Sequence, residues 1–271
     1  MIEIPEELIQ NLEIISVIYT DVDGTLVTDG CLFCKKEGFT MRNAQAVYQL
    51  LSMGVDVVMT SGREKEKLKD TARLLGFQNY IANLGIELVY NQGEKVITNF
   101  GIDVPDQQSL KNWIKNSGVI ETLFDRFPGK IDFYEPWADI LKTHYLMIGE
   151  LPDAELDLIF TEKFPELRII DNGEVAPYKQ FSKPHTYHIL PKSVGKKSAI
   201  QTDKKERKLN TKNLIGIGDS LEDISMAEEV AIFFLLDDHL PVYQSNIIRV
   251  SNSHGEGFSQ IVEFLVEKKL I

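Results

Sequence analysis

Two aspartates stand two residues apart, directly after an apolar run. The run from Ile14 to Tyr19 leads into Thr20, and Asp21-Val22-Asp23-Gly24 follows. Residues i and i+2 of an extended segment point the same way, so we expect the carboxylates of Asp21 and Asp23 to project together. Two such carboxylates repel each other unless a cation, a proton or a substrate lies between them. An Asp-Gly turn is the structural alternative, because this pair is common in turns.

Further polar residues follow other apolar runs. Ser61 comes after the run from Val55 to Met59, and Asp219 comes after Leu214–Gly218, with Asp223 four residues later. The carboxyl ends of parallel strands form the ligand crevice of an open sheet, so we expect these residues to meet there. Carboxylate oxygens around one hard cation favour magnesium over zinc. A serine hydroxyl and backbone N–H groups at a helix start can hold an anion, although each residue taken alone has a capping explanation.

Nearly continuous apolar runs, rich in β-branched residues, predict strands that are buried on both faces of a parallel sheet. The runs are residues 14–19, 55–59, 214–218, 230–236 and 247–250. Amphipathic helical patterns lie between or after them, at residues 40–54, 63–75, 220–230 and 257–269. This alternation predicts a doubly wound α/β fold with right-handed crossovers.

The middle of the chain has a different pattern. Two short strand-like runs surround Asn91-Gln92-Gly93, which is a hairpin signal. A helix, two strands, a second helix and two more strands are then expected, at residues 108–127, 131–134, 143–148, 153–164, 167–170 and 186–190. This order predicts an α+β module with an antiparallel sheet. We therefore expect residues 99–189 to form an inserted domain, and residues 1–98 and 190–271 to form the core.

Four segments in order resemble the motifs of the haloacid dehalogenase-like (HAD) phosphatases. They are Asp21-Val-Asp-Gly-Thr-Leu26, Thr60-Ser-Gly-Arg63, Lys196 within residues 191–200, and Gly218-Asp-Ser-Leu-Glu-Asp-Ile-Ser-Met226. The 132 residues from 64 to 195 leave room for the α+β cap that one branch of the family inserts there. That branch includes enzymes similar to sucrose-, trehalose- and mannosyl-3-phosphoglycerate phosphatases. The resemblance implies a Rossmann-like HAD core with an inserted α+β cap that sets substrate specificity.

The resemblance also implies roles for the four aspartates. Asp21 would be the nucleophile that forms an aspartyl-phosphate, and Asp23 would be the general acid and then the general base. Asp21, Asp219 and the backbone carbonyl of Asp23 would hold Mg²⁺. Asp223 would support the metal, either directly or through its neighbours.

Phosphate binding falls to the second and third segments. The resemblance implies that Ser61 and the N–H groups of Gly62 and Arg63 hold the transferring phosphoryl group, while Lys196 balances its charge. Thr60 precedes Ser61 and is the other candidate hydroxyl. We choose Ser61 because it directly precedes Gly-Arg, as the family hydroxyl does.

The chain departs from the family pattern at two places. Glu222 stands where this branch usually has Asn, and its longer charged side chain either disturbs phosphate contact or points away. The lysine segment, Gly195-Lys196-Lys197, usually has Ser-Lys-Gly, so Lys197 is an alternative to Lys196.

Composition excludes several classes of partner. Lys and Arg number 29 against 41 Asp and Glu, a formal net charge of −12, so neither nucleic acid nor an anionic membrane is expected as a partner. The N-terminus lacks the pattern of a signal peptide, and no apolar run is long enough to span a bilayer. Cys31 and Cys34 cannot build a disulfide framework or complete a four-ligand zinc site, so a loop pair, with redox control as the alternative, is expected. These features predict a cytoplasmic protein, either a monomer or a homodimer.

The expected function is Mg²⁺-dependent hydrolysis of a phosphomonoester, with a small sugar phosphate or a glycosyl-phosphoglycerate as substrate. Phosphohexomutase-type phosphoryl transfer by the same aspartates is one alternative. A non-catalytic protein that binds a phosphorylated metabolite is the other. Cationic residues of the insert are candidates to contact a second group of the substrate, namely Arg126, Lys130, Lys142, His144, Lys179, Lys183, His185 and His188.

Overall fold

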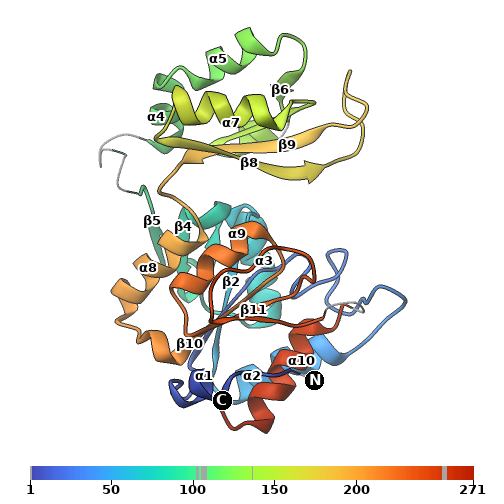
Figure 1. Cartoon of the computed structure of the whole chain (residues 1–271), viewed down its shortest axis with the longest axis vertical. Coiled ribbons are helices and arrows are strands. Elements are labelled where there is room, and N and C mark those ends of the chain that lie inside the picture. The colour runs from blue at the N-terminus through green and yellow to red at the C-terminus, as the bar shows by residue number, and fades with distance from the viewer. Residues whose placement is uncertain (1, 102–103, 105–108, 136, 252–254) are drawn as a thin grey trace. The chain divides into compact units, whose positions relative to one another are not determined.

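A computed structural model describes residues 2–101, 104, 109–135, 137–251 and 255–271. The chain forms two compact units (Figure 1). The core unit comprises Met1–Asn99 and Gly195–Ile271, and the insert unit comprises Phe100–Val194.

An eight-stranded sheet forms the centre of the core unit, in the order β12-β11-β10-β1-β2-β3-β4-β5. Strands β12 to β3 are parallel, whereas β4 and β5 are antiparallel and form the expected hairpin. The strands are β1 (Val17–Thr20), β2 (Asp56–Thr60), β3 (Tyr80–Ala82), β4 (Glu87–Tyr90), β5 (Lys95–Thr98), β10 (Leu214–Gly218), β11 (Ile232–Leu235) and β12 (Ile247–Arg249). The predicted strands are present. Strand β3 was not predicted.

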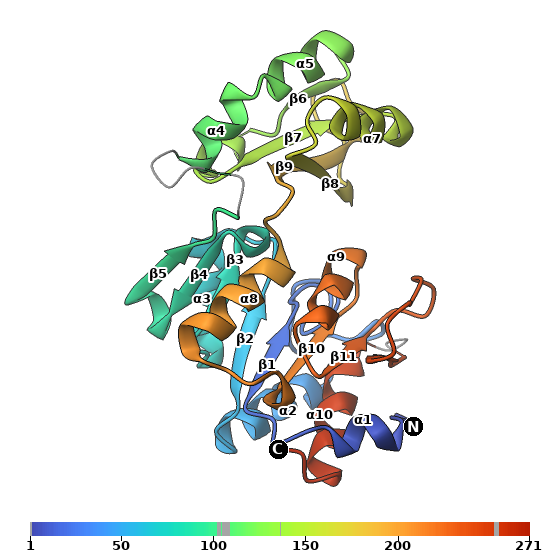
Figure 2. The ribbon, with the colours of Figure 1, turned by 60° about the vertical axis from the view of Figure 1, so that its left-hand side comes forward.

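Helices cover both faces of this sheet (Figure 2). Side chains of α2 (Arg42–Ser52), α3 (Lys65–Leu75) and α10 (Gly257–Glu267) share one apolar core with alternate residues of the strands. Helix α8 (Lys196–Arg207) and the turn Ser225–Glu228 bury their apolar side chains against the other strand residues. The doubly wound α/β fold is therefore confirmed.

Two helices of the core unit differ from the sequence prediction. The predicted helix at 220–230 is shorter, because α9 (Leu221–Ile224) passes into the 3₁₀ turn Ser225–Glu228. A short helix that was not predicted, α1 (Glu6–Gln10), lies near the N-terminus.

The strand order changes direction between β1 and β10. From β1 the chain moves outward through β2 and β3, and from β10 it moves the other way through β11 and β12. Such a switch point leaves a crevice at the carboxyl ends of the two strands, where doubly wound proteins bind ligands. Asp21 and Asp219 directly follow these two strands.

The insert unit has a four-stranded antiparallel sheet in the order β6-β7-β9-β8, so the predicted α+β module is confirmed. Its strands are β6 (Ile131–Phe133), β7 (Tyr145–Gly149), β8 (Leu167–Glu174) and β9 (His185–Pro191). Its helices are α4 (Leu110–Asn116), α5 (Val119–Arg126), α6 (Trp137–Ile140) and α7 (Asp153–Glu162). The single helix predicted at 108–127 is wrong, because Gly118 takes a φ of +80° and separates α4 from α5. Residue 108 lies outside the described residues.

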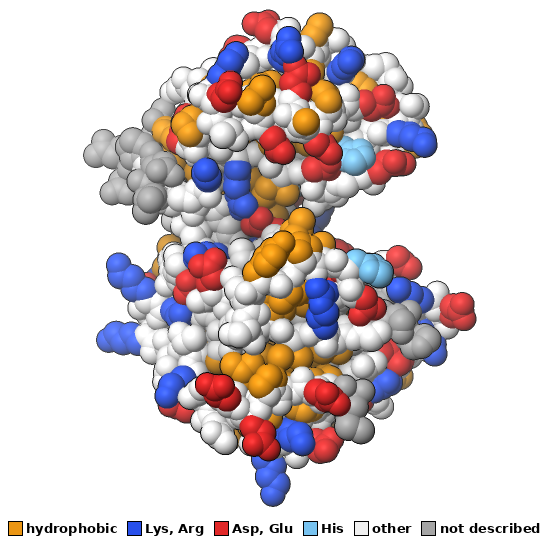
Figure 3. All heavy atoms as spheres, in the orientation of Figure 1, with side chains coloured by type: hydrophobic (Ala, Val, Ile, Leu, Met, Phe, Trp, Pro, Cys, Tyr) orange, Lys and Arg blue, Asp and Glu red, His pale blue; other side chains and the backbone are white. Residues whose placement is uncertain are grey.

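The surface carries charges of both signs. On the face seen in Figure 3, basic and acidic side chains are interspersed over both units. Within the described part of the chain, no helix is both long enough and apolar enough to cross a bilayer.

Candidate active site

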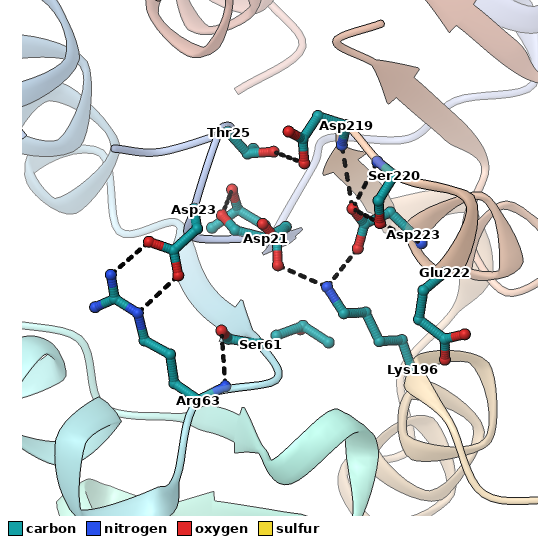
Figure 4. A network of polar contacts seen from close by, with 12 residues as sticks. Asp21, Asp23, Thr25, Ser61, Arg63, Lys196, Asp219, Ser220, Glu222 and Asp223 are labelled. Atoms are coloured by element: carbon teal, nitrogen blue, oxygen red, sulfur yellow. Dashed lines mark hydrogen bonds and ion pairs between the residues drawn. The ribbon is translucent and has the colours of Figure 1, made fainter. Parts of the chain in front are cut away.

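Three carboxylates meet at the switch point of the core sheet. Oxygen atoms of Asp21, Asp219 and Asp223 all lie within 4.8 Å of one another (Figure 4). Asp21 follows β1, and its backbone N–H donates to the Ile217 carbonyl oxygen of β10 at 2.9 Å. The parallel pairing of β1 and β10 thus places these carboxylates side by side, as the sequence predicted for the strand ends.

Asp223 is fixed by the start of the short helix α9. Its Oδ2 accepts hydrogen bonds from the backbone N–H of Asp219 (3.1 Å), the backbone N–H of Ser220 (3.0 Å) and Ser220 Oγ (2.7 Å). The side chain is fully buried. A Cβ on Gly218 would lie 2.3 Å from the Asp223 Cβ, so the last residue of β10 must be glycine.

Asp219 is fixed from the opposite side by the turn after Asp23. Gly24 has a φ of +81°, and a Cβ there would lie 2.0 Å from Asp219 Oδ2. Thr25 Oγ1 donates to Asp219 Oδ1 at 3.3 Å. Thr25 belongs to the first motif, but the sequence pattern assigns it no role, because its contact with Asp219 depends on the fold.

Lys196 reaches the cluster from the first position of α8. Its side chain is 4% exposed, its Nζ lies 2.6 Å from Asp21 Oδ1, and it also donates to Asp223 Oδ1. Burial would lower the pKa of Lys196, but the carboxylates of Asp21 and Asp223 outweigh it and the pKa is raised. Lys197, the alternative, pairs instead with the exposed Glu228.

The cluster carries more negative than positive charge. Burial is the main cause that raises the pKa of Asp21 to about 7, and Asp223 and Asp219 add to it against the opposing effect of Lys196. Burial and Asp223 likewise raise the pKa of Asp219 to about 6. Three carboxylates beside one ammonium group form an oxygen-only donor set with surplus negative charge, which fits a hard divalent cation.

Asp23 lies at the same edge of the sheet, but its carboxylate is turned away from the cluster. The Arg63 guanidinium holds it in a bidentate pair, with Nε to Oδ2 at 2.7 Å and Nη2 to Oδ1 at 2.5 Å (Figure 4). The Asp23 side chain is 55% exposed. The chain leaves β1 after Thr20 and bends at Val22, so the carboxylates of Asp21 and Asp23 do not project together as those of two residues in a straight strand would. A metal contact through the Asp23 backbone carbonyl stays a prediction.

The turn after β2 presents Ser61 rather than Thr60. Ser61 is buried, and its Oγ accepts a hydrogen bond from the Arg63 backbone N–H at 3.2 Å. Thr60 Oγ1 donates to the Val58 carbonyl oxygen at 3.3 Å, within its own strand. This geometry favours Ser61 as the anion-binding hydroxyl. A Cβ on Gly62 would lie 3.2 Å from Leu84 Cδ2, so the turn is also closely packed from behind.

A cavity of about 550 Å³ opens beside these residues in the core unit. Its lining is Asp23, Gly24, Thr28, Asp29, Gly30, Lys36, Asp219, Leu236, Asp237, Asp238, His239 and Gly255. The site is thus open to a small molecule at Asp23 and Asp219, while Asp21, Lys196 and Asp223 lie deeper.

Three residues for which the sequence left alternatives open lie outside the carboxylate group. Glu222 is half-buried, and Figure 4 shows its carboxylate directed away from Asp21 and Asp219. Cys31 and Cys34 are partly exposed free thiols, and their hydrogen bond raises the pKa of Cys34.

Several cationic candidates of the insert unit already have acidic or histidine partners. Arg126 pairs with Glu155, and Lys179 Nζ lies 2.8 Å from Asp132 Oδ2. His144 Nε2 and His188 Nδ1 are 2.7 Å apart in a buried pair. Burial lowers the pKa of His188 to about 4 and lowers that of His144 as well, so both rings are neutral near pH 7.

Comparisons with known proteins show the family to which the chain is similar. A family model described as haloacid dehalogenase-like hydrolase matches residues 18–127 and 157–252. A curated protein of Persephonella marina, named glucosyl-3-phosphoglycerate/mannosyl-3-phosphoglycerate phosphatase, is 24% identical over 269 residues. The match covers 91% of this chain and 95% of that protein.

Solved structures share the fold at low sequence identity. A phosphatase of the HAD superfamily from Bacteroides thetaiotaomicron has a TM-score of 0.65 at 13% identity, covering 95% of this chain and 96% of that one. A Thermoplasma acidophilum protein has a TM-score of 0.67 at 15% identity, covering 96% of this chain and 100% of the other. These similarities extend over both units.

Proposed function

The chain belongs to the haloacid dehalogenase-like hydrolase family and is a phosphatase, and we propose that it hydrolyses phosphate monoesters with Mg²⁺ through a phosphoryl group carried on Asp21. The observation that carries this proposal is the buried group formed by Asp21, Asp219 and Asp223 with Lys196 at the switch point of the sheet. In this proposal, the group supplies a carboxylate nucleophile, a site for a hard cation and a positive charge for the phosphoryl group.

The first half-reaction forms a bond from an Asp21 carboxylate oxygen to phosphorus. The ester P–O bond breaks, and the departing alcohol oxygen takes a proton from Asp23. When bound, Mg²⁺ supplies positive charge that keeps Asp21 ionised and shields it from the anionic substrate. Asp21, Asp219 and Asp223 would hold the ion with their carboxylates, and the Asp23 backbone carbonyl is the further proposed ligand.

The second half-reaction restores the nucleophile. Asp23 takes a proton from water, the water oxygen attacks phosphorus, and the bond from phosphorus to Asp21 breaks to release inorganic phosphate. During both steps Ser61, the N–H groups of Gly62 and Arg63, and Lys196 would hold the phosphoryl oxygens, with Thr60 supporting the turn from β2.

The two units would divide the work. We assign catalysis to the core unit and choice of substrate to the insert unit. The name of the Persephonella marina relative supports a glycosylated phosphoglycerate, or another small sugar phosphate, as the substrate class.

A panel of phosphorylated metabolites, assayed for phosphate release with Mg²⁺ and with EDTA, tests this function. We expect release from at least one sugar phosphate that requires Mg²⁺ and that Asp21→Asn abolishes. Asp56→Asn is the control, because Asp56 pairs with Arg207 at the opposite end of the sheet and should leave turnover intact. Isomerisation of a hexose phosphate without phosphate release, or silence over the whole panel, would contradict the proposal.

A further inference from the structure

Strands β3 and β4 are joined by a turn with an unusual backbone. Asn83, Leu84 and Gly85 have φ values of +53°, +56° and +93°. The left-handed region is unfavourable for a leucine, so the surrounding structure must hold Leu84 in this conformation.

One side of this turn holds the predicted phosphate-binding segment. The Asn83 backbone N–H donates to the Arg63 carbonyl oxygen at 2.9 Å, and the Leu84 N–H donates to the Ser61 carbonyl oxygen at 3.1 Å. The Leu84 side chain is 5% exposed and packs against Gly62. The hydrogen bonds from Asn83 and Leu84 therefore orient the peptide planes of the Ser61–Arg63 turn.

The other side of the turn meets the start of α8. A Cβ on Gly85 would lie 2.3 Å from the Gly195 carbonyl oxygen and 3.1 Å from the Lys196 backbone nitrogen. Asn99 Nδ2 donates both to the Gly85 carbonyl oxygen (3.0 Å) and to Ser198 Oγ (2.8 Å). The turn is thus in direct contact with the residues that place Lys196.

A further contact anchors the turn to its own hairpin. Asn83 Nδ2 donates to Glu87 Oε2 at 2.5 Å, and Lys65 Nζ lies 2.9 Å from Glu87 Oε1. Glu87 is buried and belongs to β4, while Lys65 begins α3. The turn is consequently a rigid support rather than a free loop.

We propose that the turn Asn83–Gly85 is a positioning element that sets the separation between the Ser61–Arg63 turn and Lys196. It touches no reacting atom itself. Its strained backbone allows close approach to both segments at once, and it thereby aligns the groups that bind the phosphoryl oxygens. This inference rests on the proposed function of Ser61 and Lys196.

The chain contains a matched control for this turn. Asn91, Gln92 and Gly93, between β4 and β5, have φ values of +50°, +56° and +111°, nearly the same conformation. A Cβ on Gly93 would have nothing within 4 Å. Gly85→Ala and Gly93→Ala therefore impose a similar backbone cost, but only the first presses on α8.

The experiment compares these two variants by kcat on the best phosphomonoester, by affinity for inorganic phosphate in calorimetry with Mg²⁺, and by thermal melting. We expect Gly85→Ala to lower kcat by about 10²-fold, because a shift near 1 Å in a catalytic arrangement has effects of that size. Its phosphate affinity should fall as well, while Gly93→Ala keeps both values of the wild type.

Asn99→Ala provides a second variant if Gly85→Ala does not fold. It removes one donor to Gly85 and Ser198 without a clash, and should lower kcat by about threefold to tenfold. Variants at Gly85 and Asn99 that melt earlier but keep wild-type kcat and phosphate affinity would overturn the proposal. If the wild type hydrolyses no phosphomonoester, the proposed function fails, and phosphate affinity alone then decides the role of the turn.

Discussion

The turns on either side of β4 have the same length, the same Asn-x-Gly pattern and nearly the same backbone angles, yet their surroundings differ. The first, Asn83–Gly85, lies between the Ser61–Arg63 turn and α8. The second, Asn91–Gly93, lies near the loop before β3, where the Gln92 N–H donates to the Gln78 carbonyl oxygen at 2.8 Å. Leu84 is buried, whereas Gln92 is half-exposed.

This difference teaches that local sequence determines the shape of a turn, while its neighbours determine what the turn does. Both turns close a hairpin of the same sheet. Only the first is pressed against two segments of the candidate site, since it lies at the edge where β1, β2 and β10 end. The second turn tolerates its left-handed backbone without any role in the site. In the first turn, we infer that the same backbone conformation aligns the Ser61–Arg63 turn with Lys196.

The largest expected effect is on kcat and concerns two adjacent lysines of α8, Lys196 and Lys197. Like the two turns, they are similar in sequence but have different surroundings. Lys196→Met should lower kcat by about 10²–10³-fold, because it removes the buried cation to which the proposed function assigns the charge of the transferring phosphoryl group. Lys197→Met should leave kcat within twofold, since Lys197 pairs with exposed Glu228. Steady-state kinetics with Mg²⁺ measures both, and equal losses would contradict the assignment of Lys196.

An exchange of the middle residues of the two turns should have the next largest effect, on stability. Leu84→Gln buries an amide and removes apolar contacts, so the free energy of unfolding should fall by about 2–3 kcal/mol. Gln92→Leu should change it by no more than about 0.5 kcal/mol, because that site is half-exposed. Urea denaturation compares them, and equal changes would show that the two environments do not differ as described.

A smaller effect is expected on the pH dependence of stability. The edge of the sheet at which the first turn lies also carries the buried carboxylates of Asp21 and Asp219. Burial raises the pKa of Asp21 to about 7 and that of Asp219 to about 6, above the ordinary 3.8, so these two carboxyls bind more protons in the folded protein than in the unfolded chain in that range. Without metal, stability should therefore fall as pH rises from about 4 to 7. Because the proposed Mg²⁺ site requires ionised carboxylates, Mg²⁺ should raise the melting temperature by a few degrees more at pH 8 than at pH 5.

Differential scanning calorimetry in EDTA and in Mg²⁺ measures this pH effect. Asp21→Asn is the control, because it removes the group with the larger shift and should flatten the metal-free profile. A metal-free wild-type profile between pH 4 and 7 that falls no more steeply than that of Asp21→Asn would contradict the described burial of these carboxylates.

Much of the fold and of the family was predictable from the sequence, because the signals were local. The apolar run before Asp21 and the run before Asp219 each form a buried strand, and the match to the hydrolase family confirms the assignment made from four motifs. Asn91-Gln92-Gly93 is recognisable as a hairpin signal because a short strand-like run lies on each side of it. The roles of the individual site residues remain predictions.

Other features depend on contacts between distant parts of the chain. The pattern around Asn83 was missed, since Leu84 and Ile86 make the segment resemble a continuous apolar run. Gly85 of this turn lies against Gly195, 110 positions further along the chain, and no local sequence pattern encodes such a contact. The pairing of Asp23 with Arg63 also depends on the fold, as does the break between α4 and α5 at Gly118.

The central claim is that the phosphoryl group passes through Asp21. Rapid acid quenching during turnover, followed by mass spectrometry of the peptide that contains Asp21, measures this directly. The account predicts a phosphorylated Asp21 that appears with Mg²⁺ and substrate and disappears when substrate is exhausted. Asp21→Asn should show neither the modified peptide nor phosphate release. Normal phosphate release with no phosphoryl group on Asp21, or turnover by Asp21→Asn, would contradict it.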